Sequence, residues 1–427
     1  INLAVVQNDY LLAFNLACDC VNTFTEHEYI LELKHLIGSN LINFFLLSNN
    51  KLDKNSIDIL FEKALKFYHL DKIFWEDWGT LVVIYIYYFF GFTNNNQEVN
   101  LNNLEEIQYN ILDNKFLNSS FFSDFLSNNT LSNITSETFF IKVMINLFKL
   151  INNREFTEFI NIEANSFLSS ISNYCFRIKY LWDLEENLTY EEKRKFENKI
   201  LVICHNKVNE YPFLITIYSI FFDLSSNEKI VSMLCKSYPT NDKHLNEIIE
   251  LQILEKKQIL ENSDNIKELA SIKNEVSIKV KKQYETNPYP LWNSLRPSFY
   301  NSSYKFQLPN INPKFKIISE GIKNVLVAGC GTGRHILQLA KDNPEIEFVA
   351  TDISKNSLGY AAYKAKMNEI NNVRFLLLDI LDSELLDLKF DLIECCGVIH
   401  HMKNPLDGLK SITSLLKDNG LLYLSVY

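Results

Sequence analysis

Apolar residues in the first 275 positions of the chain recur at the spacing that places them on one face of a helix. One stripe follows the i, i+3, i+4, i+7 rule, and its members are Ile57, Leu60, Phe61, Ala64, Leu65 and Tyr68. Similar stripes occupy residues 11–21, 140–150 and 245–260. Clusters rich in Asn and Ser separate them and are typical of loops and helix caps. The pattern predicts an all-α bundle or solenoid of repeat-like helices over residues 1–275.

The pattern changes after residue 320. Short apolar runs now alternate with segments of helical spacing, and the runs lie at 325–328, 347–351, 373–378, 390–395 and 421–426. Such runs are typical of strands that are covered on both faces. Alternating strands and helices predict a doubly wound parallel sheet, a Rossmann-like α/β domain, over residues 321–427.

Glycine and proline support this division. Eight of the 11 glycines follow residue 320, and no proline precedes Pro212. Because both residue types punctuate turns and interrupt helices, the chain is expected to consist of two unlike parts. Residues 276–320 are predicted to link them.

A proline-containing strap lies within this linker, at residues 283–292. Pro288 and Pro290 fix their own backbone angles and push the residues before them towards extended conformations. The strap carries three aromatic residues, Tyr284, Tyr289 and Trp292. Two interpretations stay open: a linker that packs its aromatic side chains on the next domain, or a lid over a ligand pocket of that domain.

A glycine-rich turn follows the first predicted strand of the α/β part. Gly329, Gly331 and Gly333 form a G-x-G-x-G pattern, which permits a tight turn and lets a ligand lie directly on the backbone. The pattern differs from the dinucleotide-binding G-x-G-x-x-G, because position 334 holds Arg. The shorter spacing favours a nucleoside with an amino-acid tail over a pyrophosphate.

Acidic residues follow the next two strands. Asp352 comes 23 residues after Gly329, where a carboxylate can accept hydrogen bonds from both hydroxyls of a ribose. Asp379 either accepts from the exocyclic amine of an adenine, with Ile380 packed on the ring, or caps a loop. Because ligands of such sheets bind at the carboxyl ends of the strands, we expect these residues to share one site.

With these motifs in this order, residues 321–427 resemble a class I S-adenosylmethionine-dependent methyltransferase. More loosely, the whole chain resembles bacterial methyltransferases with a tetratricopeptide-like helical region, which carry a Gln-Tyr-Glu-x-Asn-Pro-Tyr-Pro-x-Trp segment like residues 283–292. The resemblance implies that the glycine turn holds the methionine part of S-adenosylmethionine, Asp352 the ribose, and Asp379 with Ile380 the adenine. It also implies that Cys396 and Gly397 line the floor of the pocket below the sulfonium. The expected cofactor-binding residues are Gly329, Cys330, Gly331, Gly333, Asp352, Ile353, Asp379, Ile380, Cys396 and Gly397.

Two histidines after the fourth strand, His400 and His401, are the candidate catalytic residues. One of them could remove a proton from an O or N acceptor near neutral pH, or the pair anchors a turn. The resembled family has seven strands, the last two antiparallel, whereas this sequence ends at Tyr427 after the fifth. We therefore expect a truncated C-terminus with an open apolar sheet edge, and the start at Ile1 suggests a fragment there too.

Composition narrows the partners. Fifty-two acidic and 42 basic residues give a net charge of −10, which disfavours nucleic acid as a partner. The longest apolar run, residues 81–92, is shorter than the about 20 residues that span a bilayer, so no membrane partner is expected. Eight cysteines without Cys-x-x-Cys spacing predict reduced thiols in a cytoplasmic protein and no metal site.

The sequence thus predicts a methyltransferase (EC 2.1.1.-) that transfers a methyl group from S-adenosylmethionine to an unidentified small-molecule or protein acceptor by in-line displacement. The helical region is the expected site of a protein partner. Two alternatives stay open. One is a helical interaction scaffold with a vestigial cofactor-binding domain. The other is a nicotinamide-dependent oxidoreductase, which Asp352 permits and the glycine spacing disfavours.

Overall fold

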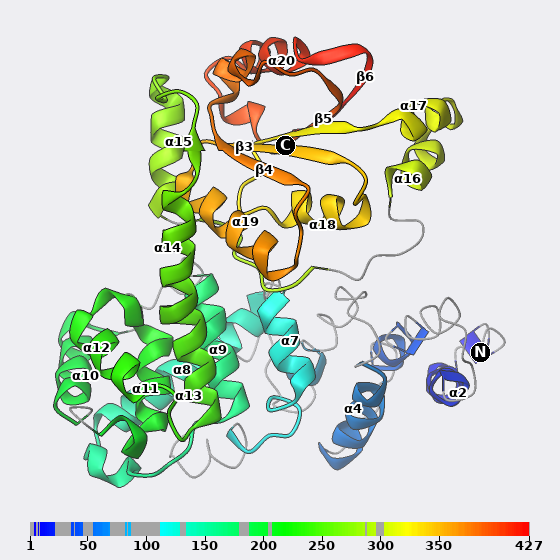
Figure 1. The fold of residues 1–427 in the computed structure, drawn as a ribbon. Helices are drawn as coiled ribbons and strands as arrows, with labels where there is room; N and C mark the ends of the chain where they lie inside the picture. Colours follow the sequence, from blue (N-terminus) through cyan, green and yellow to red (C-terminus); the bar gives the residue numbers. More distant parts are fainter. Residues whose placement is uncertain are drawn as a thin grey trace. The chain divides into compact units, whose positions relative to one another are not determined.

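The computed structural model (Figure 1) describes residues 4–5, 7, 9–21, 36–37, 39–45, 54–68, 82, 84–86, 112–128, 134–178, 188–203, 207–286, 288–295 and 303–426. The chain divides into two compact units, Ile1–Ile253 and Leu254–Tyr427. The division falls within a π-helical segment, Glu250–Glu255, earlier than the boundary after residue 275 that the sequence pattern suggested.

The first unit is helical, as predicted. Its longer helices are α2 (Tyr10–Val21), α4 (Lys54–Tyr68), α7 (Ser120–Asn128), α8 (Ile134–Asn152), α9 (Ser166–Arg177), α10 (Tyr190–Ile203), α11 (Pro212–Phe221), α12 (Glu228–Ser237) and α13 (Lys243–Ile249). Short 3-10 helices lie at Phe156–Phe159, Val208–Glu210 and Leu224–Ser226. Helix α9 contacts α7, α11 and α13. A tetratricopeptide-like arrangement of these helices stays a prediction.

The apolar stripes explain how the helices of this unit pack. Ile57, Phe61 and Ala64 of α4 are buried, and the Phe61 ring meets the ring of Tyr85 edge-on at 4.9 Å. The stripe at 245–260 is divided in the structure between α13, the π-helical segment and the next helix. Most of the run at 81–92 lies outside the described residues. Among the helices that are described, none is long and apolar enough to cross a bilayer.

The second unit is the predicted Rossmann-like domain. Its helices are α14 (Lys256–Asp264), α15 (Glu275–Thr286), α16 (Tyr304–Ile311), α17 (Lys316–Gly321), α18 (Arg334–Asp342), α19 (Lys355–Met367) and α20 (Pro405–Thr413), with 3-10 helices at Pro313–Phe315, Ile380–Leu386 and Ile399–His401. Its strands are β1 (Lys267–Glu268), β2 (Asn324–Ala328), β3 (Glu347–Asp352), β4 (Val373–Leu377), β5 (Phe390–Cys396) and β6 (Leu416–Ser425). The order in the sheet is β1-β4-β3-β2-β5-β6, and all five pairings are parallel.

Two apolar cores lie on opposite faces of this sheet. Because side chains alternate along a strand, Val325 and Val327 of β2 face α18 and α19, while Leu326 faces the side of α20. Figure 1 shows α18 and α19 on one face and α20 on the other. The order reverses at β2, since the chain passes from β2 outwards to β4 and then returns to β5 on the other side of β2. Such a reversal opens a crevice at the carboxyl ends of the strands.

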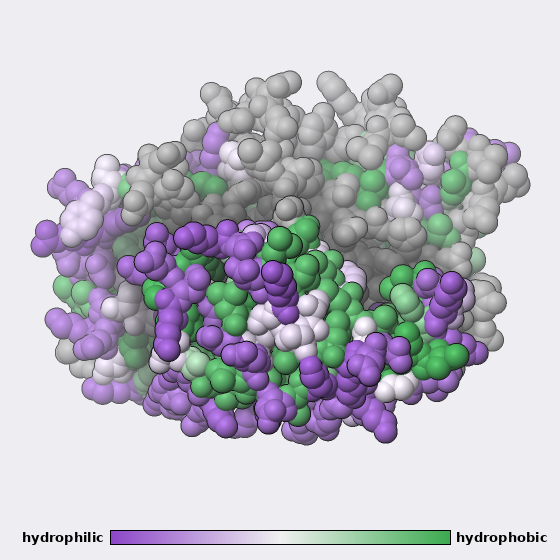
Figure 2. Space-filling view, turned by 90° about the horizontal axis from the view of Figure 1, so that it is seen from above, coloured by the Kyte–Doolittle hydropathy of each residue, from purple (hydrophilic) through white to green (hydrophobic). Residues whose placement is uncertain are grey.

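The sheet has one more strand at its edge than the sequence predicts. Five strands were predicted and six are present, because the two-residue strand β1 pairs with the outer side of β4. The other edge is β6, where Tyr423 (52% exposed) and Leu424 (38%) are apolar residues at the surface. The space-filling view in Figure 2 shows apolar residues interspersed with hydrophilic ones on the described part of one face.

Candidate functional site

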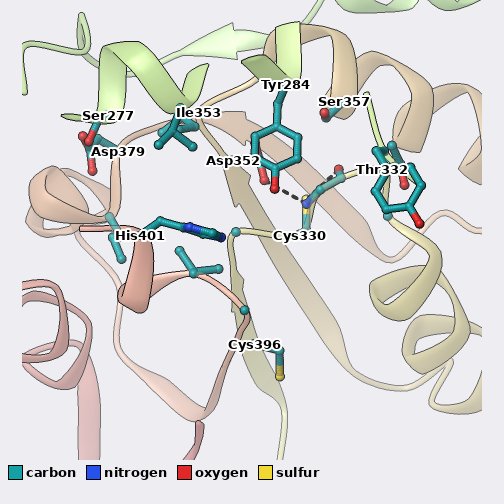
Figure 3. Close-up of a pocket in the computed structure, with 18 of the residues that line it drawn as sticks. Ser277, Tyr284, Cys330, Thr332, Asp352, Ile353, Ser357, Asp379, Cys396 and His401 are labelled. Carbon is teal, nitrogen blue, oxygen red and sulfur yellow. Dashed lines mark hydrogen bonds between the residues drawn. The ribbon is translucent and has the colours of Figure 1, made fainter. Parts of the chain in front are cut away.

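A cavity of about 500 Å³ lies at the carboxyl ends of β2, β3, β4 and β5 (Figure 3). This volume is within the range of small-molecule sites in proteins. The order of the strands places the cavity at the reversal point of the sheet. All residues expected from the sequence to bind the cofactor line it: Gly329, Cys330, Gly331, Gly333, Asp352, Ile353, Asp379, Ile380, Cys396 and Gly397.

The glycine turn joins β2 to α18 and requires glycine for two reasons. Gly329 and Gly333 have φ angles of +74° and +84°, which L side chains rarely adopt. A Cβ atom on Gly333 would lie 2.5 Å from the Cβ of Ala361, and one on Gly329 would lie 2.3 Å from Cγ2 of Val398. At Gly331 a Cβ would meet nothing within 4 Å, so this part of the turn has open space above it.

Asp352 ends β3 and is tied to the glycine turn. Its Oδ2 accepts from Gly331 N at 2.8 Å, and its Oδ1 accepts from Ser354 N at 2.9 Å. Burial raises the pKa of Asp352 above its usual value, and the backbone N–H donors partly oppose this rise. The carboxylate keeps further lone pairs for hydroxyl donors. The acidic residue at the tip of the second predicted strand therefore lies where a ribose diol can be held.

Asp379 caps the turn after β4 and also lines the cavity. Its carboxylate accepts from Leu381 N at 3.1 Å and so caps the 3-10 helix that follows β4. It also lines the cavity beside Ile380, although only 3% of its surface is exposed. A carboxylate and an apolar side chain at this point fit the amine and the ring face of an adenine.

Helix α15 forms a wall of the cavity, of which the sequence pointed only to Tyr284. Val276, Ser277, Val280 and Tyr284 line the cavity from this helix. In Figure 3, Tyr284 points towards Asp352 and Cys330. The signal was present in the sequence as the i, i+4, i+8 spacing of 276, 280 and 284. It was missed because this helix was assigned to the end of the helical region and to the linker.

The aromatic residues of the strap do not all fit the same one of the two interpretations. Tyr284 and Tyr289 line the cavity, as a lid would. Trp292 does not, so for this residue the lid interpretation is wrong and the interpretation as a linker residue packed on the domain is confirmed. Its ring is 1% exposed in the core, where Nε1 donates to the carbonyl of Thr332 at 2.9 Å and the ring meets Tyr360 edge-on. An indole this large gains more from burial, with its N–H satisfied by the glycine turn, than from a place at a polar cavity.

The two candidate catalytic histidines are also separated. His401 lines the cavity, whereas His400 is not among the lining residues, although the two rings are 4.1 Å apart. Burial lowers the pKa of His401, and the neighbouring His400 lowers it further. His401 therefore stays neutral, and so able to accept a proton, down to a lower pH than an ordinary histidine.

A hydrogen-bonded cluster beside the cavity was not predicted. Glu394 of β5, whose side chain is 6% exposed, is hydrogen-bonded to His335 Nε2 and to the hydroxyl of Tyr304. His335 lines the cavity. Burial and the neighbouring Glu394 raise the pKa of Tyr304 well above its usual value. The cluster keeps a buried carboxylate fully bonded and orients an imidazole at the cavity wall.

Taken together, the donors and acceptors fit S-adenosylmethionine. The open turn at Gly331 suits the amino-acid tail, Asp352 the ribose, and Asp379 with Ile380 the adenine. Cys396 and Gly397, at the end of β5, line the remaining floor. Burial raises the pKa of the Cys330 thiol well above its usual range, and Asp352 adds to this, so Cys330 is a neutral packing group in the turn.

Comparison with known proteins identifies a methyltransferase domain in this part of the chain. Residues 320–427 match a family model described as a methyltransferase domain. Over 108 residues the chain is 37% identical to an uncharacterized protein of Synechococcus sp., covering 25% of this chain and 26% of that protein. It is 27% identical to a tRNA U34 carboxymethyltransferase of Campylobacter fetus, over 39% of this chain and 54% of that protein. A solved structure, PKMT2 from Rickettsia typhi with AdoHcy, is 28% identical over 30% of this chain and 26% of that chain, with a TM-score of 0.25.

The second unit therefore contains an S-adenosylmethionine-dependent methyltransferase domain at the C-terminal end of the sequence. S-adenosylmethionine, the cofactor that the sequence predicts, is the one that the lining of the cavity fits. The chain spans between a quarter and about half of the length of the relatives just named.

Proposed function

We propose that the chain is a methyltransferase that methylates a nucleophilic small-molecule or protein acceptor. The observation that supports this most directly is the link between the glycine turn and Asp352, because Gly331 N donates to the carboxylate at the reversal point of the sheet. When bound, S-adenosylmethionine supplies an activated methyl group, which an acceptor N, O, S or C atom takes by in-line displacement, with S-adenosylhomocysteine as leaving group. Positioning and exclusion of water are then the main tasks of the protein.

The residues around the cavity can perform these tasks. Asp352 and Asp379 orient the nucleoside, and the glycine turn lets the tail lie on the backbone. Tyr284 and Tyr289 cover the cavity and exclude water. His401 and His335 are the imidazoles at the cavity wall, and either can take a proton from an acceptor that carries one at the attacking atom.

The acceptor itself is proposed to be a small molecule or a protein. The net charge of −10 supports this, because the phosphate backbone of a nucleic acid requires cationic partners. One relative is named as a tRNA-modifying enzyme, so tRNA belongs among the acceptors tested. We further propose that the helical unit binds a protein partner, supported by Tyr190 (79% exposed) and Val202 (77%) on the surface of α10.

Calorimetric titration with S-adenosylhomocysteine and with NAD tests the cofactor, and S-adenosylhomocysteine alone should bind. Binding of NAD alone would point to an oxidoreductase instead. Incubation with methyl-tritiated S-adenosylmethionine and separate small-molecule, protein and tRNA fractions of a cell extract tests transfer. We expect label in a small-molecule or protein fraction. Cofactor binding without label in any fraction would favour a helical scaffold with a vestigial domain.

A further inference from the structure

Helix α15 presents one face to the cofactor cavity along most of its length. Val276, Val280 and Tyr284 are spaced by four residues, and Ser277 lies beside the first of them. Figure 3 shows Ser277 and Tyr284 at the cavity. A cofactor in the cavity would therefore contact this helix, and its release would depend on how firmly the helix is held.

The residue after Tyr284 fastens this helix to the rest of the domain. Glu285 does not line the cavity. Its Oε2 accepts from Ser354 Oγ at 2.8 Å and from the backbone N of Asn356 at 2.9 Å. Its main-chain carbonyl accepts from Asn356 Nδ2 at 2.8 Å. Three hydrogen bonds from one residue thus join the end of α15 to the start of α19.

The start of α19 is also where the ribose-binding carboxylate is held. Ser354 is the N-cap of α19; its hydroxyl accepts from Ser357 N, and its own N–H donates to Asp352. Asp352, Ser354 and Glu285 therefore satisfy three of the donors that the first turn of a helix leaves free. Both carboxylates also interact favourably with the positive end of the helix dipole. Ser354, which is fully buried, bonds directly to both acids.

We propose that Glu285 is a latch: a positioning residue that fixes α15, and with it Tyr284, over the bound cofactor without touching the cofactor itself. The latch sets how long the cofactor stays bound, because α15 must loosen before the nucleoside can leave past Tyr284. The identity of the cofactor in this inference rests on the proposed function.

The first test measures backbone hydrogen exchange of the full chain in the absence of cofactor. In Glu285→Gln the amide oxygen can take the place of Oε2, but both hydrogen bonds lose the negative charge that strengthens them. Exchange in α15 should rise about tenfold, while β2 and α18 stay as protected as in the unaltered protein. The matched control is Lys279→Gln, which removes a charge at an exposed position in the middle of the same helix and should leave α15 unchanged. Unchanged exchange in Glu285→Gln, or an equal rise throughout the domain, would overturn the latch.

The second test measures the dissociation rate of tritiated S-adenosylhomocysteine after rapid dilution. Glu285→Gln should release it about tenfold faster at unchanged binding stoichiometry, and Lys279→Gln should match the unaltered protein. A partly misfolded variant would instead lose stoichiometry and keep the dissociation rate. Faster exchange in α15 with an unaltered dissociation rate would overturn the coupling. If the unaltered protein binds no S-adenosylhomocysteine, the proposed function fails, and hydrogen exchange alone decides whether Glu285 holds α15.

Discussion

Replacement of Asp352 by alanine should strongly weaken cofactor binding. The carboxylate offers acceptors to both hydroxyls of a ribose, and hydrogen bonds to a charged group contribute about 1.5–3 kcal/mol each. The change also leaves the N–H groups of Gly331 and Ser354 without their acceptor. A net loss of about 3 kcal/mol corresponds to roughly 150-fold weaker binding of S-adenosylhomocysteine.

Two further variants separate charge from shape. Asp352→Asn keeps one acceptor oxygen and should lose only about tenfold in affinity. Glu347→Ala removes an exposed carboxylate at the opposite end of the same strand and should leave the affinity unchanged. Isothermal titration calorimetry gives all three dissociation constants, with thermal unfolding as a check on folding. Asp352→Ala protein that is folded and binds S-adenosylhomocysteine as tightly as the unaltered protein would refute the assignment of the site.

The pH dependence supplies an independent check of the same residue. The ionised carboxylate is the form that accepts from both hydroxyls, so binding is strong above the pKa of Asp352 and lost below it. Because burial raises that pKa above the usual 3.8, the loss should begin at a higher pH than for an exposed aspartate. Asp352→Asn should lack this transition. A transition that persists in Asp352→Asn would show that another group causes it.

Three other predictions follow from the surroundings of the site. Gly333→Ala should lower the melting temperature and abolish S-adenosylhomocysteine binding, because the new Cβ would meet Ala361 at 2.5 Å and alanine is strained at this positive φ. A variant that is fully stable and binds S-adenosylhomocysteine would contradict this. Trp292→Phe loses the hydrogen bond to Thr332 and should lower the free energy of unfolding by about 1 kcal/mol, or the melting temperature by about 3 °C. The affinity for S-adenosylhomocysteine should change little. A large loss of that affinity at unchanged stability would support Trp292 as part of the lid. His401→Asn should reduce tritium transfer to an acceptor fraction about 100-fold, with the affinity for S-adenosylhomocysteine nearly unchanged. In the unaltered protein, transfer should persist below pH 6.5, because burial lowers the pKa of His401. Equal transfer rates in His401→Asn and the unaltered protein would leave His401 without a role as base.

The sequence by itself determined the parts of the site that are encoded locally. Gly329, Gly331 and Gly333 are close together in the chain, and their spacing follows from one turn that must bring the backbone near a ligand. Asp352 and Asp379 come directly after apolar runs, and the ends of parallel strands meet at one edge of a sheet whatever the detailed packing. Five of the six strands carried enough apolar residues to be recognised in the same way.

The remaining features depend on contacts between residues far apart in the chain, which no local pattern records. Strand β1 has only two residues, both exposed, and is a strand because β4 offers it an edge. For Trp292 the sequence left packing on the domain and a place in a lid as alternatives, and the carbonyl of Thr332 together with the apolar core decides for packing. Spacing along a chain can specify which residues lie on one face of an element. Only the packed structure, in which polar groups must find partners as apolar surface is buried, decides what that face meets.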